Sequence, residues 1–128
     1  MKAYLLVALG GAIGSVSRFG ISELFASRTT SSFPWATLLI NLAGCLLIGL
    51  IIGIAERYQI GHYSLRSFFV VGVCGGFTTF SSFSLETLRL FQASQNIQAI
   101  LYILASILLG LALTILGYSL VNGSLRLF

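Results

Sequence analysis

The stretch GGFTTFSSFS, Gly75 to Ser84, opens with two glycines and then mixes phenylalanines with hydroxyl side chains. It lies in the middle of a long apolar region, where such polar groups are unusual. Glycine and β-branched threonine both weaken an α-helix, so we expect a helix interruption near Gly75–Thr79. The alternative is an unbroken helix whose Ser and Thr hydroxyls bond back to carbonyls of the same helix.

The composition around this stretch is typical of a membrane protein. Of 128 residues, 57% are hydrophobic and 8% are charged, and the mean hydropathy is +1.01. A soluble domain carries about 25% charged residues, so this chain has too little polar surface to cover a water-soluble globule. We therefore expect an all-α integral membrane protein, with residues 1–128 forming a single domain.

Four apolar stretches are long enough to cross a bilayer, which takes roughly 20 residues. They cover approximately residues 2–24, 33–55, 67–90 and 97–121. The first is too long for a cleaved signal peptide, so we interpret it as a helix of the mature protein. Four spans place both termini on the same side of the membrane.

The basic residues show only a weak bias between the two sides of the membrane. One side has Lys2, Arg57, Arg66 and Arg126, and the other has Arg28 and Arg89, with Arg18 near the end of the first span. Orientation follows this bias, so two interpretations stay open. One is a dual-topology protein acting as an antiparallel homodimer, and the other is a single topology with cytoplasmic termini. The net charge of +4 is ordinary for a membrane protein and indicates no nucleic-acid partner.

Two polar residues lie inside the spans, where placing a polar side chain in lipid costs free energy. Asn41 lies about two turns into the second span, and its amide must find partners there. It could form an interhelical hydrogen bond, line a pathway, or do both. Arg18 could extend toward the membrane surface, or supply a fixed positive charge near a pathway entrance that favours anions.

The phenylalanines suggest a kind of ligand. Phe77, Phe80 and Phe83 recur every three residues and project to a loosely shared side of a helix. The edge of a phenyl ring is positive and can approach an anion. Hydroxyl groups of the same stretch could donate to the same anion, and the fourth span offers one more: Ser81, Ser82, Ser84 and Thr114. Together they suit a small, strongly hydrated anion, although such a stripe is also compatible with ordinary packing.

Residues for catalysis or for a side-chain metal site are missing from the sequence. The single histidine is His62, and the acids Glu23, Glu56 and Glu86 each lie at or near the end of a span. An enzyme is therefore not expected, and a proton-coupled carrier would need an acid deep in the membrane. A helix interruption instead offers free backbone carbonyls, which favour cations.

Three blocks of the sequence, in order, resemble the Fluc/CrcB family of fluoride channels across essentially the whole chain. They are GGAIGSVSRF (Gly10–Phe19), TLLINLAG (Thr37–Gly44) and GVCGGFTTFSSFSLE (Gly72–Glu86), the last being the most specific. Ser82 stands where many members of the family have threonine, which keeps the hydroxyl.

The resemblance implies a passive, selective channel that exports fluoride across a microbial membrane, the inner membrane in a Gram-negative cell. It implies an antiparallel dual-topology homodimer with two pores and a structural Na⁺ at its centre. By matching positions, the fluoride pathway contains Asn41, Phe80, Ser81, Phe83 and Thr114.

The same resemblance assigns the Na⁺ ligands to the backbone carbonyls of Gly75 and Thr78. Arg18 and Glu86 match recurring positions of the family, with vestibule or structural roles. Two other functions compete with this one. A small multidrug or cation exporter should have a glutamate deep in the first span, where only Glu23 stands, at its end. A non-transporting assembly subunit would use its glycines only to pack helices.

Overall fold

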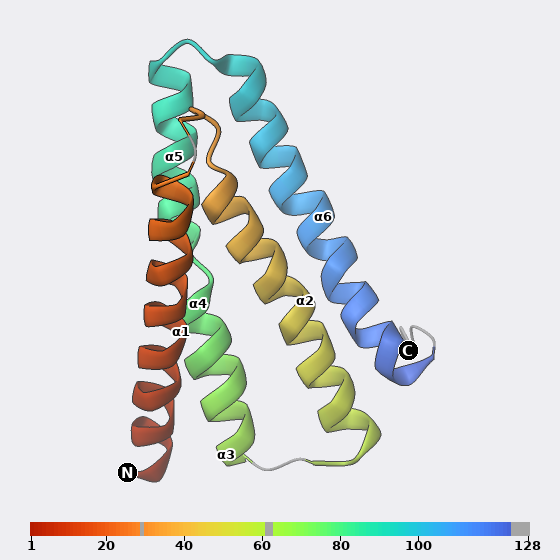
Figure 1. Ribbon diagram of the computed structural model, residues 1–128. Helices are drawn as coiled ribbons and strands as arrows, with labels where there is room; N and C mark the ends of the chain where they lie inside the picture. The colour runs from red at the N-terminus through yellow and green to blue at the C-terminus, as the bar shows by residue number, and fades with distance from the viewer. Residues whose placement is uncertain (29, 61–62, 124–128) are drawn as a thin grey trace.

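The computed structural model describes residues 1–28, 30–60 and 63–123, and the regular secondary structure in these ranges is entirely helical. The elements are α1 (Lys2–Ala26), α2 (Trp35–Arg57), α3 (Tyr63–Leu65), the π-helix η1 (Arg66–Cys74), α4 (Gly75–Phe77), α5 (Phe80–Gln92) and α6 (Asn96–Asn122). Figure 1 shows them as a bundle of long, roughly aligned rods.

The bundle contains four helical segments long and apolar enough to cross a membrane, counted over the described ranges. They are α1, α2, the segment Tyr63–Gln92 that joins α3 to α5, and α6, with mean hydropathies of 1.5, 2.6, 1.5 and 2.6. The third segment, called span three below, is longer at both ends than the expected 67–90. The protein is thus a multi-pass membrane protein.

The spans associate as two pairs. α1 packs along η1 and α4, while α2 packs along α6 (Figure 1). The N-terminus, the start of span three and the last turn of α6 lie toward the same end of the bundle. Fewer contacts join one pair to the other, mainly from α2 to span three and from α5 to α6.

Glycines bring the helices of each pair into backbone contact. A Cβ on Gly14 of α1 would overlap the Val73 carbonyl oxygen and lie 2.7 Å from the Phe77 nitrogen. A Cβ on Gly76 would lie 2.6 Å from the Gly11 carbonyl oxygen. Close approach through small residues is how helices associate in lipid, where no hydrophobic force drives them together. The glycines of α2 and α6 are used in the same way, with Gly49 against the backbone of Thr114.

Span three is not one regular helix. After the π-helical turns of η1 and the short α4, Thr78 (φ −79°, ψ 156°) and Thr79 (φ −148°, ψ 115°) have extended backbone dihedrals. Helical geometry resumes at Phe80, and the Thr79 hydroxyl caps α5 by accepting from the Ser82 N–H at 3.2 Å. The two extended residues lie within Gly75–Thr79, where the sequence predicts an interruption.

The buried core lies where α2, α5 and α6 meet. Leu38, Leu90, Ala99 and Tyr102 are buried together there. Phe33 and Phe83 pack against this cluster from two sides, and their ring centroids lie 5.6 and 5.1 Å from that of Tyr102. The cluster fixes one side of α5 against the α2–α6 pair.

Candidate functional site

Asn41 holds the extended part of span three. Its amide nitrogen donates to the Thr79 carbonyl oxygen at 3.1 Å, and its amide oxygen accepts from the Thr79 N–H at 2.8 Å. This pair of bonds satisfies both backbone groups of one non-helical residue inside the membrane, where unpaired groups are costly. Asn41 therefore makes the interhelical hydrogen bond that was one of its two expected roles.

This arrangement frees the Gly75 and Thr78 carbonyls, among others, from the helical ladder. In a continuous helix the Thr79 N–H would donate to Gly75, and the Ser82 N–H would donate to Thr78. These two donors bond instead to Asn41 and to the Thr79 hydroxyl. The Gly75 and Thr78 carbonyls, which the resemblance assigns to Na⁺, thus lack their helical donors. The described residues contain no cluster of three His, Cys, Asp or Glu side chains, and a carbonyl site uses none.

Arg18 and Ser15 bring α1 to the same place. The Arg18 Nε donates to the Gly76 carbonyl oxygen at 3.2 Å, and the Ser15 hydroxyl donates to it at 3.4 Å. Gly76 lies in the last helical residues before the extended segment, where the negative end of the helix dipole favours a cation. The Arg18 side chain is therefore directed at span three, and its positive charge lies beside the Gly76 carbonyl.

The start of α5 carries the predicted rings and hydroxyls. The ring centroids of Phe80 and Phe83 are 5.5 Å apart, and Phe80 is 78% exposed. The Ser81 hydroxyl lies 3.2 Å from the Thr79 hydroxyl, which also donates to the Ser82 hydroxyl at 3.1 Å. The structure thus places Ser81 and both rings within about one turn of the extended segment. Phe77, which the spacing grouped with these rings, is buried on the other side of that segment, in α4.

Glu86 is held by two side chains that the sequence reasoning missed. Its carboxyl oxygens accept from the Thr37 hydroxyl at 2.7 Å and from the Tyr102 hydroxyl at 2.8 Å. Thr37 and Tyr102 are buried. Thr37 stands one helical turn before Asn41, on the same face of α2, and this spacing could have identified it. Tyr102 is a phenol inside a span, and such a group usually needs a polar partner.

Thr114 lies apart from this cluster. Its hydroxyl donates to the Gly110 carbonyl of its own helix at 3.0 Å. It lies twelve residues beyond Tyr102 on α6, which corresponds to about 18 Å along the helix. Ser106 lies between them, four residues after Tyr102 and eight before Thr114. Its buried hydroxyl has no hydrogen-bond partner among the described residues. A single chain therefore brings together every predicted pathway residue except Thr114.

Comparisons with known proteins identify relatives along almost the whole chain. The family of CrcB-like proteins, described as camphor resistance (CrcB), matches residues 5–118. A fluoride-specific ion channel FluC from Thermus thermophilus is 48% identical over 120 residues, covering 94% of this chain and 95% of the relative. A protein of the same name from Azobacteroides pseudotrichonymphae is 44% identical over 118 residues, covering 92% and 94%.

Proposed function

The chain belongs to the CrcB-like family, and we propose that it is a passive, selective fluoride channel. The observation that carries this proposal is the 48% identity, over nearly the full length of both proteins, to a relative named a fluoride-specific ion channel. The family is one of ion channels, and the protein is not an enzyme. Fluoride is the ion it would carry.

The proposed path runs past Asn41 and the first turn of α5. One amide N–H of Asn41 is engaged by the Thr79 carbonyl, and the second N–H is left for an ion. The edges of Phe80 and Phe83, with the hydroxyl of Ser81, would add further positive contacts to the ion. Because fluoride is costly to dehydrate, such donors must replace its water shell over a narrow path, and a larger anion would meet a steric barrier.

Arg18 and Glu86 would act beside this path through their charges. Arg18 lies against the Gly76 carbonyl and adds positive potential where the anion enters. The oxygens of Glu86 accept from Thr37 and Tyr102, which hold the carboxyl group in one position between three helices. We assign Glu86 a structural role, fixing the distance from α5 to α2 and α6.

The Gly75 and Thr78 carbonyls fit the proposed Na⁺ site. Both lack their helical donors, and Gly75 is exposed on the surface of the single chain, as a site shared by two chains requires. When bound there, the ion would supply a fixed positive charge and hold the extended segment in place.

The exposed groups near the middle of span three support a dimer. Phe80 is 78% exposed, and Ser81 and Ser84 are exposed beside it. Polar groups and irregular backbone at membrane depth are tolerated only when they are covered by protein or line a cavity. A second, antiparallel copy would cover them, and its two-fold symmetry would create two equal paths. The weak charge bias of the loops is compatible with insertion in both orientations.

Liposomes that contain only the purified protein provide the test. Efflux of fluoride and of chloride is followed with ion-selective electrodes, and protein-free liposomes give the leak. We expect fast fluoride loss and negligible chloride loss. A folded dimer without fluoride flux would overturn the proposal, and the glycines and phenylalanines would then be packing residues only.

A further inference from the structure

An apolar groove separates the two helix pairs at the end of the bundle that is farther from Glu86 and its partners Thr37 and Tyr102. It lies between the last turns of α2 and the first turns of span three, and its volume is about 720 Å³. This is within the roughly 300–1,000 Å³ of typical small-molecule sites. We propose that this groove binds one acyl chain of an anionic phospholipid and that Arg66 binds its phosphate.

The groove changes from apolar to polar along its length. Ile51 and Ile52 line it from α2, and Phe69 and Val70 line it from η1. Ile51 lies six residues, or about 9 Å, before Arg57 at the end of α2, at the depth of lipid chains. The polar lining residues are at the loop end, where headgroups lie: Glu56, Gln59, Tyr63 and Arg66. An amphipathic gradient of this kind matches one phospholipid molecule.

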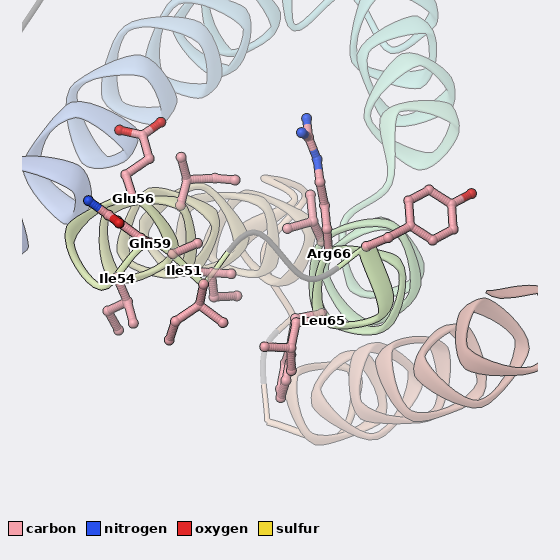
Figure 2. Close-up of a pocket in the computed structure, with 12 residues that line it drawn as sticks. Ile51, Ile54, Glu56, Gln59, Leu65 and Arg66 are labelled. Atoms are coloured by element: carbon pink, nitrogen blue, oxygen red, sulfur yellow. The ribbon is translucent and has the colours of Figure 1, made fainter. Parts of the chain in front are cut away.

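The charge at the loop end favours an anionic headgroup. Arg66 is exposed, and its guanidinium has no hydrogen bond or ion pair with any residue that the structure describes. Figure 2 shows Arg66 and Glu56 extending to the same side of the two helices that form the groove. Glu56 is already bonded to the Tyr118 hydroxyl at 2.6 Å. Lys2 is the first residue of α1 and Arg57, which donates to the Val121 carbonyl, is the last residue of α2. With Arg66, these basic residues outnumber the carboxylate of Glu56 at this end of the bundle, among the residues that the structure describes.

The walls of the groove suit a flexible chain better than a second helix. Helices that pack in lipid use small residues at the contact, as Gly14 and Gly49 do in this protein. The groove is lined mainly by branched and aromatic side chains, with Ala55 the small residue among them. The glycine nearest to it on α2, Gly53, faces the α6 residues Tyr118, Val121 and Asn122 instead.

Native mass spectrometry of the intact channel tests the site by counting retained lipids. The channel is mixed with equal amounts of phosphatidylglycerol and phosphatidylcholine, and we expect it to retain mainly phosphatidylglycerol. Arg66→Gln should lower this preference about fivefold, the contribution of one basic residue near an anionic headgroup. Arg66→Lys should keep the preference, and so should Arg89→Gln, which removes a charge from the last turn of α5.

A second variant fills the groove and keeps its charge. Ala55→Phe should lower the retention of both lipids, because its ring occupies the space for the acyl chain. Equal lipid preference in Arg66→Gln and the unchanged protein would overturn the proposal. So would an Ala55→Phe variant that keeps its lipids but loses dimer, since the groove would then be an interface between copies. Lipid retention is measured without ion flux, so this proposal and the proposed channel activity fail independently.

Discussion

From Arg66 to Phe77, span three packs against α1 through glycine, whereas from Phe80 to Gln92 it carries hydroxyls and phenyl rings. In the first half, Gly72 and Gly76 meet the backbone of α1. In the second half, Phe80 and Ser81 are exposed, and Glu86 bonds to side chains of two other helices. The extended residues Thr78 and Thr79 separate the halves. One span thus contains a closely packed support and a polar surface, joined where Asn41 holds the backbone.

The glycine contact between α1 and the first half of span three should be the most sensitive to substitution. In Gly14→Val, the new side chain would overlap the Val73 carbonyl and approach the Phe77 nitrogen. Backbone atoms cannot move aside as side chains do, so we expect the cost to exceed the roughly 3 kcal/mol of severe overpacking. Size-exclusion chromatography should recover no folded protein. Gly20→Ala is the matched control, because a Cβ at Gly20 meets nothing within 4 Å and should be tolerated. Equal recovery of both variants would contradict the close packing.

The junction of the two halves, at Thr78 and Thr79, should be the next most sensitive to substitution. Asn41→Leu removes both bonds to Thr79 and leaves a backbone donor and acceptor unpaired. Each such group costs about 1–3 kcal/mol, so we expect lower thermal stability and loss of fluoride efflux. Asn122→Leu is the control, since this amide makes one bond of 3.3 Å to the Gly53 carbonyl near the end of α6. If both substitutions lowered the melting temperature equally, Asn41 would not have the special role assigned to it.

A substitution in the second half of span three, Phe80 to Gln92, should lower fluoride efflux without disrupting the fold. Phe80→Ile removes one aromatic edge from the proposed path but keeps an apolar side chain. An aromatic contact contributes about 0.5–1.5 kcal/mol, so we expect efflux to fall about tenfold while the protein stays assembled. Phe91→Ile changes another exposed phenylalanine of α5 and should leave efflux unchanged. Unaltered efflux in Phe80→Ile would remove the ring from the mechanism.

The smallest effect on fluoride efflux should come from the hydrogen bonds of Glu86, to which we assign a structural role. Tyr102→Phe removes the hydroxyl that donates to Glu86 and keeps the buried ring, at a cost of about 1–3 kcal/mol. Thermal unfolding in detergent measures this cost. Tyr118→Phe removes a similar bond to Glu56, an exposed carboxyl that water can solvate, and it should cost less. A larger loss of stability in Tyr118→Phe than in Tyr102→Phe would contradict this prediction.

Hydropathy was sufficient to predict the number of spans. Four apolar runs predict four membrane-length helices, and the structure has them with ends shifted by a few residues. Gly75–Thr79 is weak helix sequence, and the two extended residues lie inside it. These predictions depend on local composition, which is read directly from consecutive residues.

Contacts between distant residues could not be predicted in the same way. The bonds from Asn41 to Thr79 and from Tyr102 to Glu86 depend on the rotation and depth of two helices. Hydropathy does not fix either quantity. The sequence indicated that Asn41 needs a partner but not which one, and it gave no role to Thr37 or Tyr102. The sequence analysis likewise did not predict the π-helical turns of η1, which packs against α1.

The backbone contact between α1 and span three also limits how this protein can change in evolution. Gly10 and Gly14 are one turn apart, as are Gly72 and Gly76. Deleting one residue between Gly10 and Gly14 would rotate the following turn by about 100° and direct a side chain at the neighbouring backbone. Substitutions on the face of α1 that points away from span three should be accepted, whereas insertions and deletions between these glycines should be eliminated. The distance between the glycines, more than the identity of their neighbours, should therefore persist among descendants.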